Sequence, residues 1–284
     1  MTCAWQELLA VLPLWMRKDT DRLGAENLRE IRMRKNCMPE LVLNEKRWDL
    51  ERKLTQEDLN YTVNAASRYS PWAAGSAARG YITIKGGHRI GLCGEAVFIQ
   101  GEVNGFHSYS SLCIRIARDF PGIAASLDKT RGSILVLGAP GWGKTTFLRD
   151  LVRQIGTSET VCVVDEREEL FPDGFDRGKH VDVLSGCSKE KGITMLLRTM
   201  GPDCIAVDEI TAPEDTTALL QAANCGIRLL ASAHAESLYD FQKRLVYRPL
   251  MENHIFDVVV LLKKDRTYTV ERMTEWFSGG SVRY

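Results

Sequence analysis

Residues 133–146 carry the sequence SILVLGAPGWGKTT, an apolar run followed by a glycine-rich loop. Gly138, Gly143, Lys144 and Thr145 satisfy the G-x-x-x-x-G-K-[ST] pattern of a phosphate-binding loop. Glycines let backbone N–H groups point at phosphate oxygens, and a helix beginning near Lys144 presents its positive end to the same anion. Lys144 supplies a charge for the β- and γ-phosphates, and the Thr145 hydroxyl is placed to hold Mg²⁺. The predicted nucleotide-binding residues are Gly138, Ala139, Pro140, Gly141, Trp142, Gly143, Lys144, Thr145 and Thr146.

Two acidic residues end another apolar run in the second half of the chain. Asp208 and Glu209 directly follow Cys204–Val207, in the form of a Walker B element. We expect Asp208 to bind Mg²⁺ through water and Glu209 to polarise the water that attacks the γ-phosphate. Glu166 is a second candidate for orienting the water because it ends a neighbouring predicted strand, and the sequence alone does not rank the two glutamates.

A histidine and three arginines are further candidates for contacts with phosphate. His234 ends another predicted strand and could sense the γ-phosphate, with Ser232 a weaker candidate of the same kind. A lone histidine is more often a polar residue with a structural hydrogen bond. Arg89, Arg115 and Arg118 lie before the nucleotide domain, and arginine fingers often come from another subunit. Ordinary surface arginines remain the common alternative for any single one.

Apolar strands and helical patterns alternate around these residues and predict a parallel α/β sheet. The carboxyl ends of such strands meet at one edge, where these sheets bind ligands. A closing antiparallel hairpin is expected over 255–263 and 267–273. The expected strands are 134–137, 161–164, Cys204–Val207 and 228–231, and the expected helices are Lys144–Ile155, 192–200 and Pro213–Asn224.

The first part of the chain has a different pattern. A helix broken at Pro13 is followed by one element over 21–31, two short β-like pieces over 40–44 and 46–50, a helix over 55–67, and a short helix over 72–79. From residue 81 the period changes to two, which predicts strands at 81–84, 95–99 and 111–118 with a hairpin-type turn at 104–105. We place the domain boundary near residue 120, giving an α+β domain over 1–120 and a nucleotide domain over 121–284.

Composition restricts the partners and the compartment. The 284-residue chain has 37 basic and 37 acidic residues, so its neutrality gives no global reason to expect nucleic-acid binding. Its eight cysteines form no C-x-x-C pair, and Cys162 and Cys204 sit in apolar strand runs, which favours buried thiols in a reducing compartment. No apolar run reaches the roughly 18 residues needed to span a bilayer.

Short strings along nearly the whole chain resemble those of one family. They are EIRMR at 30–34, GGHRIGLCGEAV at 86–97, SSLCIRIAR at 110–118, GAPGWGKTT at 138–146, DER at 165–167 and DEI at 208–210. Together they resemble the stage III sporulation AA proteins, which belong with the type II and type IV secretion ATPases. The strings before residue 120 are more specific than the phosphate loop.

That resemblance implies a RecA-like P-loop ATPase that uses ATP and Mg²⁺. It implies a cytoplasmic homo-oligomer, expected to be a hexameric ring, at the mother-cell face of a membrane, where integral membrane components form a secretion-like channel during endospore formation. Ser232 stands where secretion ATPases usually have threonine. The roles carried over are phosphate and Mg²⁺ binding for Lys144 and Thr145, the acidic box for Glu166, the Walker B pair for Asp208 and Glu209, the histidine box for His234, and finger candidates for Arg115 and Arg118.

Two other functions remain compatible with these residues. A nucleic-acid-translocating ring ATPase would share the loop, although zero net charge and the lack of an aromatic and basic stripe argue against it. A nucleotide-gated scaffold would bind ATP without useful hydrolysis, so it would tolerate Glu209→Gln and Glu166→Gln. A small-molecule kinase is disfavoured because no acceptor-site lid is evident.

Overall fold

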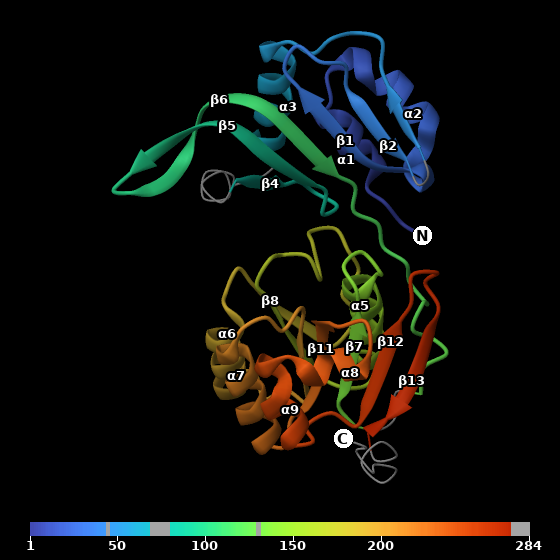
Figure 1. Ribbon diagram of the computed structural model, residues 1–284, viewed down its shortest axis with the longest axis vertical. Helices are drawn as coiled ribbons and strands as arrows, with labels where there is room; N and C mark the ends of the chain where they lie inside the picture. Colours follow the sequence, from blue (N-terminus) through green and yellow to red (C-terminus); the bar gives the residue numbers. More distant parts are fainter. Residues whose placement is uncertain (44–45, 69–79, 129–131, 274–284) are drawn as a thin grey trace. The chain divides into compact units, whose positions relative to one another are not determined.

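The computed structural model describes residues 1–43, 46–68, 80–128 and 132–273 (Figure 1). The chain divides into two compact units. The first contains Met1–Asp119 together with Pro172–Phe175, and the second contains Phe120–Phe171 and Asp176–Tyr284. The sequence placed a boundary near residue 120 but did not anticipate that Pro172–Phe175, in the excursion after the second predicted strand, group with the first unit.

In its described residues the first unit contains a six-stranded antiparallel sheet in the order β3-β2-β1-β6-β5-β4. Figure 1 shows that β5 and β6 form a long hairpin whose far end extends away from the rest of this unit. The helices are α1 (Trp5–Val11), α2 (Leu14–Asn27) and α3 (Gln56–Arg68), and the strands are β1 (Leu28–Arg34), β2 (Glu40–Leu43), β3 (Arg47–Asp49), β4 (Tyr81–Thr83), β5 (Arg89–Ile99) and β6 (Glu102–Arg115).

Several predictions for this unit are confirmed and others are wrong. The strand predicted at 95–99 begins earlier, at Arg89, and the strand predicted at 111–118 begins at Glu102 and ends at Arg115. Pro13 separates α1 from α2, and α3 lies within one residue of the predicted helix. The turn predicted at 104–105 is wrong, because these residues lie inside β6. The hairpin turns instead at Gln100 and Gly101, where φ is +53° and +86°. The single element expected over 21–31 is also wrong, because α2 ends at Asn27 and a strand begins at Leu28. The helix predicted over 72–79 lies outside the described residues.

His88 joins the beginning of the chain to the end of β6 inside the first unit. Its side chain is fully buried. The backbone N–H of Ala117 donates to Nδ1 at 3.1 Å, and Nε2 lies 3.0 Å from the carbonyl oxygen of Ala4. Since Nδ1 accepts, the proton must sit on Nε2, which donates to Ala4. The site is therefore built for a neutral imidazole.

Acidification should destabilise the first unit through His88. Burial lowers the pKa of His88 from its ordinary 6.5, and the charge of Arg118 acts in the same direction, while the bond to Ala4 and the charge of Glu7 oppose them. A lowered folded-state pKa means that this stability is present above pH 6.5 and is lost as the pH falls toward the folded value. We expect a lower urea midpoint at about pH 5.5 than at about pH 7.5. In His88→Gln the difference should shrink, and an equal difference in both proteins would contradict this role.

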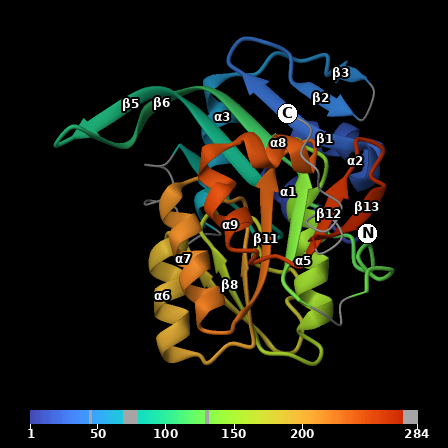
Figure 2. The ribbon, with the colours of Figure 1, turned by 60° about the horizontal axis from the view of Figure 1, so that its bottom comes forward.

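The second unit contains, within its described residues, a seven-stranded sheet in the order β13-β12-β7-β11-β10-β8-β9 (Figure 2). Every neighbouring pair is parallel except β12 with β13. Its strands are β7 (Ile134–Gly138), β8 (Val161–Asp165), β9 (Val181–Ser185), β10 (Cys204–Val207), β11 (Arg228–His234), β12 (Val258–Leu262) and β13 (Tyr268–Arg272), and its helices are α5 (Lys144–Ile155), α6 (Lys189–Thr199), α7 (Pro213–Asn224), α8 (Leu238–Lys243), a 3₁₀ turn η1 (Leu245–Tyr247) and α9 (Arg248–Glu252).

Both faces of this sheet are buried, as the continuous apolar strands predicted. Along β7, Ile134 and Val136 join the hydrophobic cluster that contains Phe147 of α5. Leu135 and Leu137 point to the opposite face, into a cluster with residues of α6 and α7. Figures 1 and 2 show α5 on one side of the strands and α6 and α7 on the other. The alternation places the sheet between two helical layers. Because neighbouring strands from β12 to β9 run parallel, their carboxyl ends lie at one end of the sheet.

The predicted parallel strands and the antiparallel pair β12–β13 are confirmed, with two additions. β9 was not predicted. It lies at the sheet edge and is only partly buried, so it lacks the apolar run that marked the other strands. β12 pairs in parallel with β7, which makes the final hairpin a continuation of the main sheet. Cys162 and Cys204 are both buried, and burial raises the pKa of the Cys162 thiol to about 11.

Asp150 of α5 ties the start of the second unit to its central helix. Its side chain is 1% exposed. It accepts hydrogen bonds from the backbone N–H groups of Gly122 and Ala124 at 2.9 and 2.8 Å, and from Arg153 and Gln154 at 2.9 and 2.5 Å. A buried carboxylate with four donors satisfies groups that would otherwise be left without partners. This network fixes the chain before β7 against the helix that follows the phosphate loop.

Asp150→Ala should destabilise the second unit by about 3 kcal/mol, because it leaves the Arg153 cation buried without its closest carboxylate. The measurement is urea unfolding of the full chain, followed by hydrogen exchange at Gly122 and Ala124. The matched control is Asp176→Ala, whose carboxylate is 78% exposed and 3.9 Å from Arg153. We expect that variant to stay within about 0.5 kcal/mol of the wild type. Equal losses in both variants would contradict the account.

Candidate functional site

The predicted phosphate loop connects β7 to α5, as the sequence indicated. Gly141 and Gly143 have φ values of +79° and +95°, a conformation that favours glycine. Gly143 is the N-cap of α5, and no side chain caps this end of the helix. The first N–H groups of α5 are therefore not capped by the protein's own side chains and suit an anion. This arrangement fits the phosphates of a nucleotide held by residues 138–146.

Lys144 is the cation at the start of α5, and it is only 7% exposed. Its ammonium group donates to the carbonyl oxygen of Ala139 at 3.2 Å and lies 2.7 Å from Nδ1 of His234. Burial lowers the pKa of Lys144, and the charges of Glu209 and Asp208 partly offset that effect. An arriving phosphate would add negative charge beside this buried ammonium and favour its charged form.

Asp208 and Thr145 come together although Thr145 lies in the first turn of α5 and Asp208 directly follows β10. The Thr145 hydroxyl donates to one carboxylate oxygen of Asp208 at 2.6 Å, and the Ser232 hydroxyl donates to the other. β11 lies between β7 and β10, so Ser232 on β11 lies between the phosphate loop that follows β7 and the acids that follow β10. Hydroxyl and carboxylate oxygens are the hard donors that Mg²⁺ prefers. The pair therefore fits the predicted metal role, in which Thr145 and Asp208 would hold the ion.

Glu209 is the centre of a chain of contacts that leads back to Lys144. Its backbone has φ of +53°, uncommon for a residue other than glycine, and its N–H donates to the Ser232 hydroxyl at 2.9 Å. Its carboxylate contacts Nε2 of His234 through one oxygen, and Arg167 donates to the other at 2.8 Å. Lys144, His234, Glu209 and Arg167 thus form one continuous series. Ser232, the weaker candidate from sequence, contacts both Asp208 and Glu209.

Glu166 lies in a separate set of contacts. Its carboxylate is 2.7 Å from the ammonium group of Lys189, which is 6% exposed and also lies 3.4 Å from Asp215. Lys189 begins α6 and Asp215 lies in the first turn of α7, so this cation joins three elements. In the described residues, the contacts of Glu166 lead to Lys189 and Asp215, whereas those of Glu209 lead through His234 to Lys144 of the phosphate loop.

Asp165, the first acid of the DER string, has a structural role. It is 2% exposed and accepts backbone N–H bonds from Glu169, Leu170 and Phe171, each at 2.9 Å. Burial raises the pKa of Asp165, and these three donors oppose the shift. Asp165 therefore shapes the loop that carries Glu166 and Arg167. This inward orientation could not be predicted from the string itself, because all three of its residues are polar.

The candidate arginines Arg115 and Arg118 belong to the first unit. Arg118 donates to the carbonyl oxygen of Ala25 at 2.6 Å and to that of Leu28, so it holds the end of α2. Arg115 is exposed at the end of β6, opposite Glu30 of β1. Arg89 lies over the ring of Tyr81 at 4.2 Å. The finger role stays a prediction for Arg115 and Arg118.

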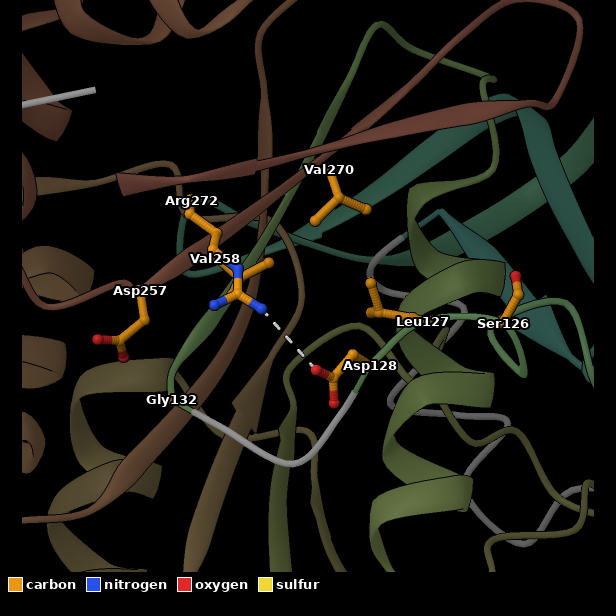
Figure 3. A pocket seen from close by; sticks show the side chains of 8 residues that line it. All are labelled: Ser126, Leu127, Asp128, Gly132, Asp257, Val258, Val270 and Arg272. Carbon is orange, nitrogen blue, oxygen red and sulfur yellow. Dashed lines mark ion pairs between the residues drawn. The ribbon is translucent and has the colours of Figure 1, made fainter. Parts of the chain in front are cut away.

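A cavity of about 370 Å³ lies near the points where β7 and β12 begin, at the end of the second sheet away from the candidate site (Figure 3). Its lining includes Gly132, shortly before β7, Asp257, directly before β12, and Arg272 at the end of β13. Arg272 faces Asp128 across it at 3.9 Å. None of the predicted nucleotide or metal residues lines this cavity. It is therefore separate from the site at the carboxyl ends of the strands.

Comparisons with known proteins agree with this architecture. The profile of the family described as "Sporulation stage III, protein AA" matches residues 4–273. Stage III sporulation protein AA of Bacillus subtilis (strain 168) is 35% identical over 272 residues, covering 88% of each chain. In the described parts of the chain, no helix is long and apolar enough to cross a membrane.

Solved structures of other proteins share the fold. The pilus retraction motor PilT with bound ADP matches with a TM-score of 0.62 at 17% identity, covering 91% of this chain and 81% of that one. The Legionella pneumophila ATPase DotB matches with a TM-score of 0.58 at 16% identity, covering 95% and 84%. These likenesses confirm the predicted fold class, a RecA-like α/β nucleotide domain preceded by a smaller α+β domain. With the family profile spanning nearly all of its length, the chain belongs to the sporulation stage III protein AA family.

Proposed function

We propose that this protein is a Mg²⁺-dependent ATPase that hydrolyses ATP to ADP and phosphate. The observation that carries the proposal is the convergence of Lys144, Thr145, Asp208 and Glu209 at one sheet edge, through contacts that run from the phosphate loop to the Walker B pair. An uncapped helix end and a buried ammonium group bind the phosphates, and Mg²⁺ would be held by Thr145 and Asp208. Glu209 accepts a proton from the attacking water.

We further propose that the ATPase works as a homo-oligomeric ring, expected to be a hexamer. In this role it powers a secretion-like complex across the envelope during endospore formation, from the mother-cell cytoplasm, through integral membrane components. Family membership supports the sporulation setting. The shared fold with a protein named as a pilus retraction motor with bound ADP, and a 31% identity over 106 residues to the "Type IV pilus assembly ATPase TfpB", support the motor class. That second match covers 37% of this chain and 18% of the relative.

ATP turnover by the purified full chain tests the enzymatic part of the proposal. Phosphate release should be measured over a protein concentration series, with Mg²⁺ and with EDTA in its place. We expect release only with Mg²⁺, and a specific rate that rises with protein concentration as rings assemble. Single-stranded DNA at low salt should leave the rate unchanged, which separates this activity from nucleic-acid translocation. No release at any concentration with Mg²⁺ would remove the proposal.

A further inference from the structure

Arg167 is an exposed cation within the site, and it has no role in the hydrolysis proposed for Lys144, Thr145, Asp208 and Glu209. It follows Asp165 and Glu166 after the end of β8, and 57% of its side chain is exposed. Its Nη1 atom donates to Oε2 of Glu209 at 2.8 Å, across a separation of 42 residues in the sequence. Because more than half of this side chain already lies in solvent, it can change partners without opening a packed core.

The carboxylate of Glu209 has a contact at each of its two oxygens. Arg167 engages one oxygen and Nε2 of His234 engages the other. The backbone of Glu209 is fixed as well, since its N–H donates to Ser232 at a left-handed φ. A carboxylate bound to a guanidinium at one oxygen and an imidazole N–H at the other accepts a proton from water poorly. Arg167 has to leave Glu209 before this residue can act as a base.

The γ-phosphate of ATP is the group best suited to draw Arg167 away. Lys144, where the phosphates are expected, is joined to Glu209 through the single imidazole ring of His234. A γ-phosphate at Lys144 therefore arrives within the same series of contacts as Arg167. A planar guanidinium forms paired hydrogen bonds with phosphate oxygens, and phosphate carries more negative charge than one carboxylate. ADP has no γ-phosphate and would leave Arg167 on Glu209.

Building on the proposed ATPase function, we propose that Arg167 is a phosphate sensor in its own subunit. On ATP binding it exchanges the carboxylate of Glu209 for the γ-phosphate. After the exchange Arg167 contacts the γ-phosphate, a group that ADP lacks. The carboxylate of Glu209 is then free to accept a proton from the attacking water. Arg167 thereby couples recognition of the triphosphate to activation of the base, and loss of the γ-phosphate after hydrolysis restores the resting pair.

Nucleotide affinities of the full chain test this exchange. The probes are ADP and a non-hydrolysable ATP analogue, each titrated with Mg²⁺ against the wild type, Arg167→Gln and Arg272→Gln. Arg272 is a matched control, because its side chain is 60% exposed and ion-paired with Asp128 at the opposite sheet edge (Figure 3). We expect Arg167→Gln to lower the affinity for the ATP analogue about tenfold and to leave the affinity for ADP within about twofold of the wild-type value. Arg272→Gln should change neither.

A double-mutant cycle tests the competition itself. If Glu209 competes with the γ-phosphate for Arg167, Glu209→Gln should bind the ATP analogue more tightly than the wild type, and the gain should vanish when Arg167 is also Gln. An unchanged ratio of analogue to ADP affinity in Arg167→Gln, or purely additive effects in the cycle, would overturn the sensor while leaving the ATPase intact. A wild-type chain that bound neither nucleotide would instead overturn the proposed function, and the sensor with it.

Discussion

Replacing Lys144 with alanine should reduce ATP turnover at least about 100-fold, because the variant loses the one ammonium group that the phosphate loop places against the phosphates. This group is nearly buried and already oriented by Ala139 and His234. A preorganised cation stabilises developing charge without the reorganisation that solvent would need. The rate of phosphate release at saturating ATP and the affinity for ADP should both fall, since the β-phosphate loses its partner as well.

The control for this result is Lys191→Ala, which removes an exposed ammonium group from α6. That variant should keep the turnover rate and nucleotide affinity of the wild type. Thermal unfolding of both variants establishes whether the fold is retained. Turnover by a folded Lys144→Ala within about tenfold of the wild type would show that phosphate release does not depend on this loop.

The sequence predicted the parts of the site that depend on local pattern. A glycine signature between an apolar strand and a helix indicated the phosphate loop, and α5, β10 and α7 have the predicted bounds. Each of these segments is buried along its length or on a regular face, so its periodicity is visible in the chain itself. Asp208 and Glu209 were predicted for the same reason, because they directly follow the apolar residues of β10.

The remaining parts of the site depend on contacts between distant segments. Arg167 meets Glu209 across 42 residues, and Lys189 meets Glu166 across 23. Nothing in the local sequence distinguishes these two cations from others, because only tertiary packing brings them to the acids. β8 lies beside β10, and α6 packs against β8. β9 was missed because an edge strand that is half exposed has no continuous apolar run. Arg167 could have been found by looking for basic residues that follow one parallel strand and could reach acidic residues that follow its neighbour.

Exchanging Glu209 for glutamine should separate the two candidate bases. The amide keeps the shape of the side chain but cannot take a proton from water, so we expect turnover to fall about 100-fold or more while ATP binding is not weakened. Glu166→Gln should stay within about tenfold of the wild type, because Glu166 lies against Lys189, a cation that also has Asp215 as a partner. The measurement is single-turnover hydrolysis at saturating protein, with equilibrium binding of ATP measured in parallel.

The comparison of these two variants decides between three mechanisms, since the substitutions are matched in size and charge. A large loss in Glu209→Gln alone assigns the base to the residue connected to Lys144 through His234. The reverse order would assign it to Glu166 and would require Lys189 to release that carboxylate during the cycle. Wild-type activity of the assembled complex with both variants would favour the nucleotide-gated scaffold, in which binding of ATP is sufficient and the contacts around Glu209 only report the presence of the γ-phosphate.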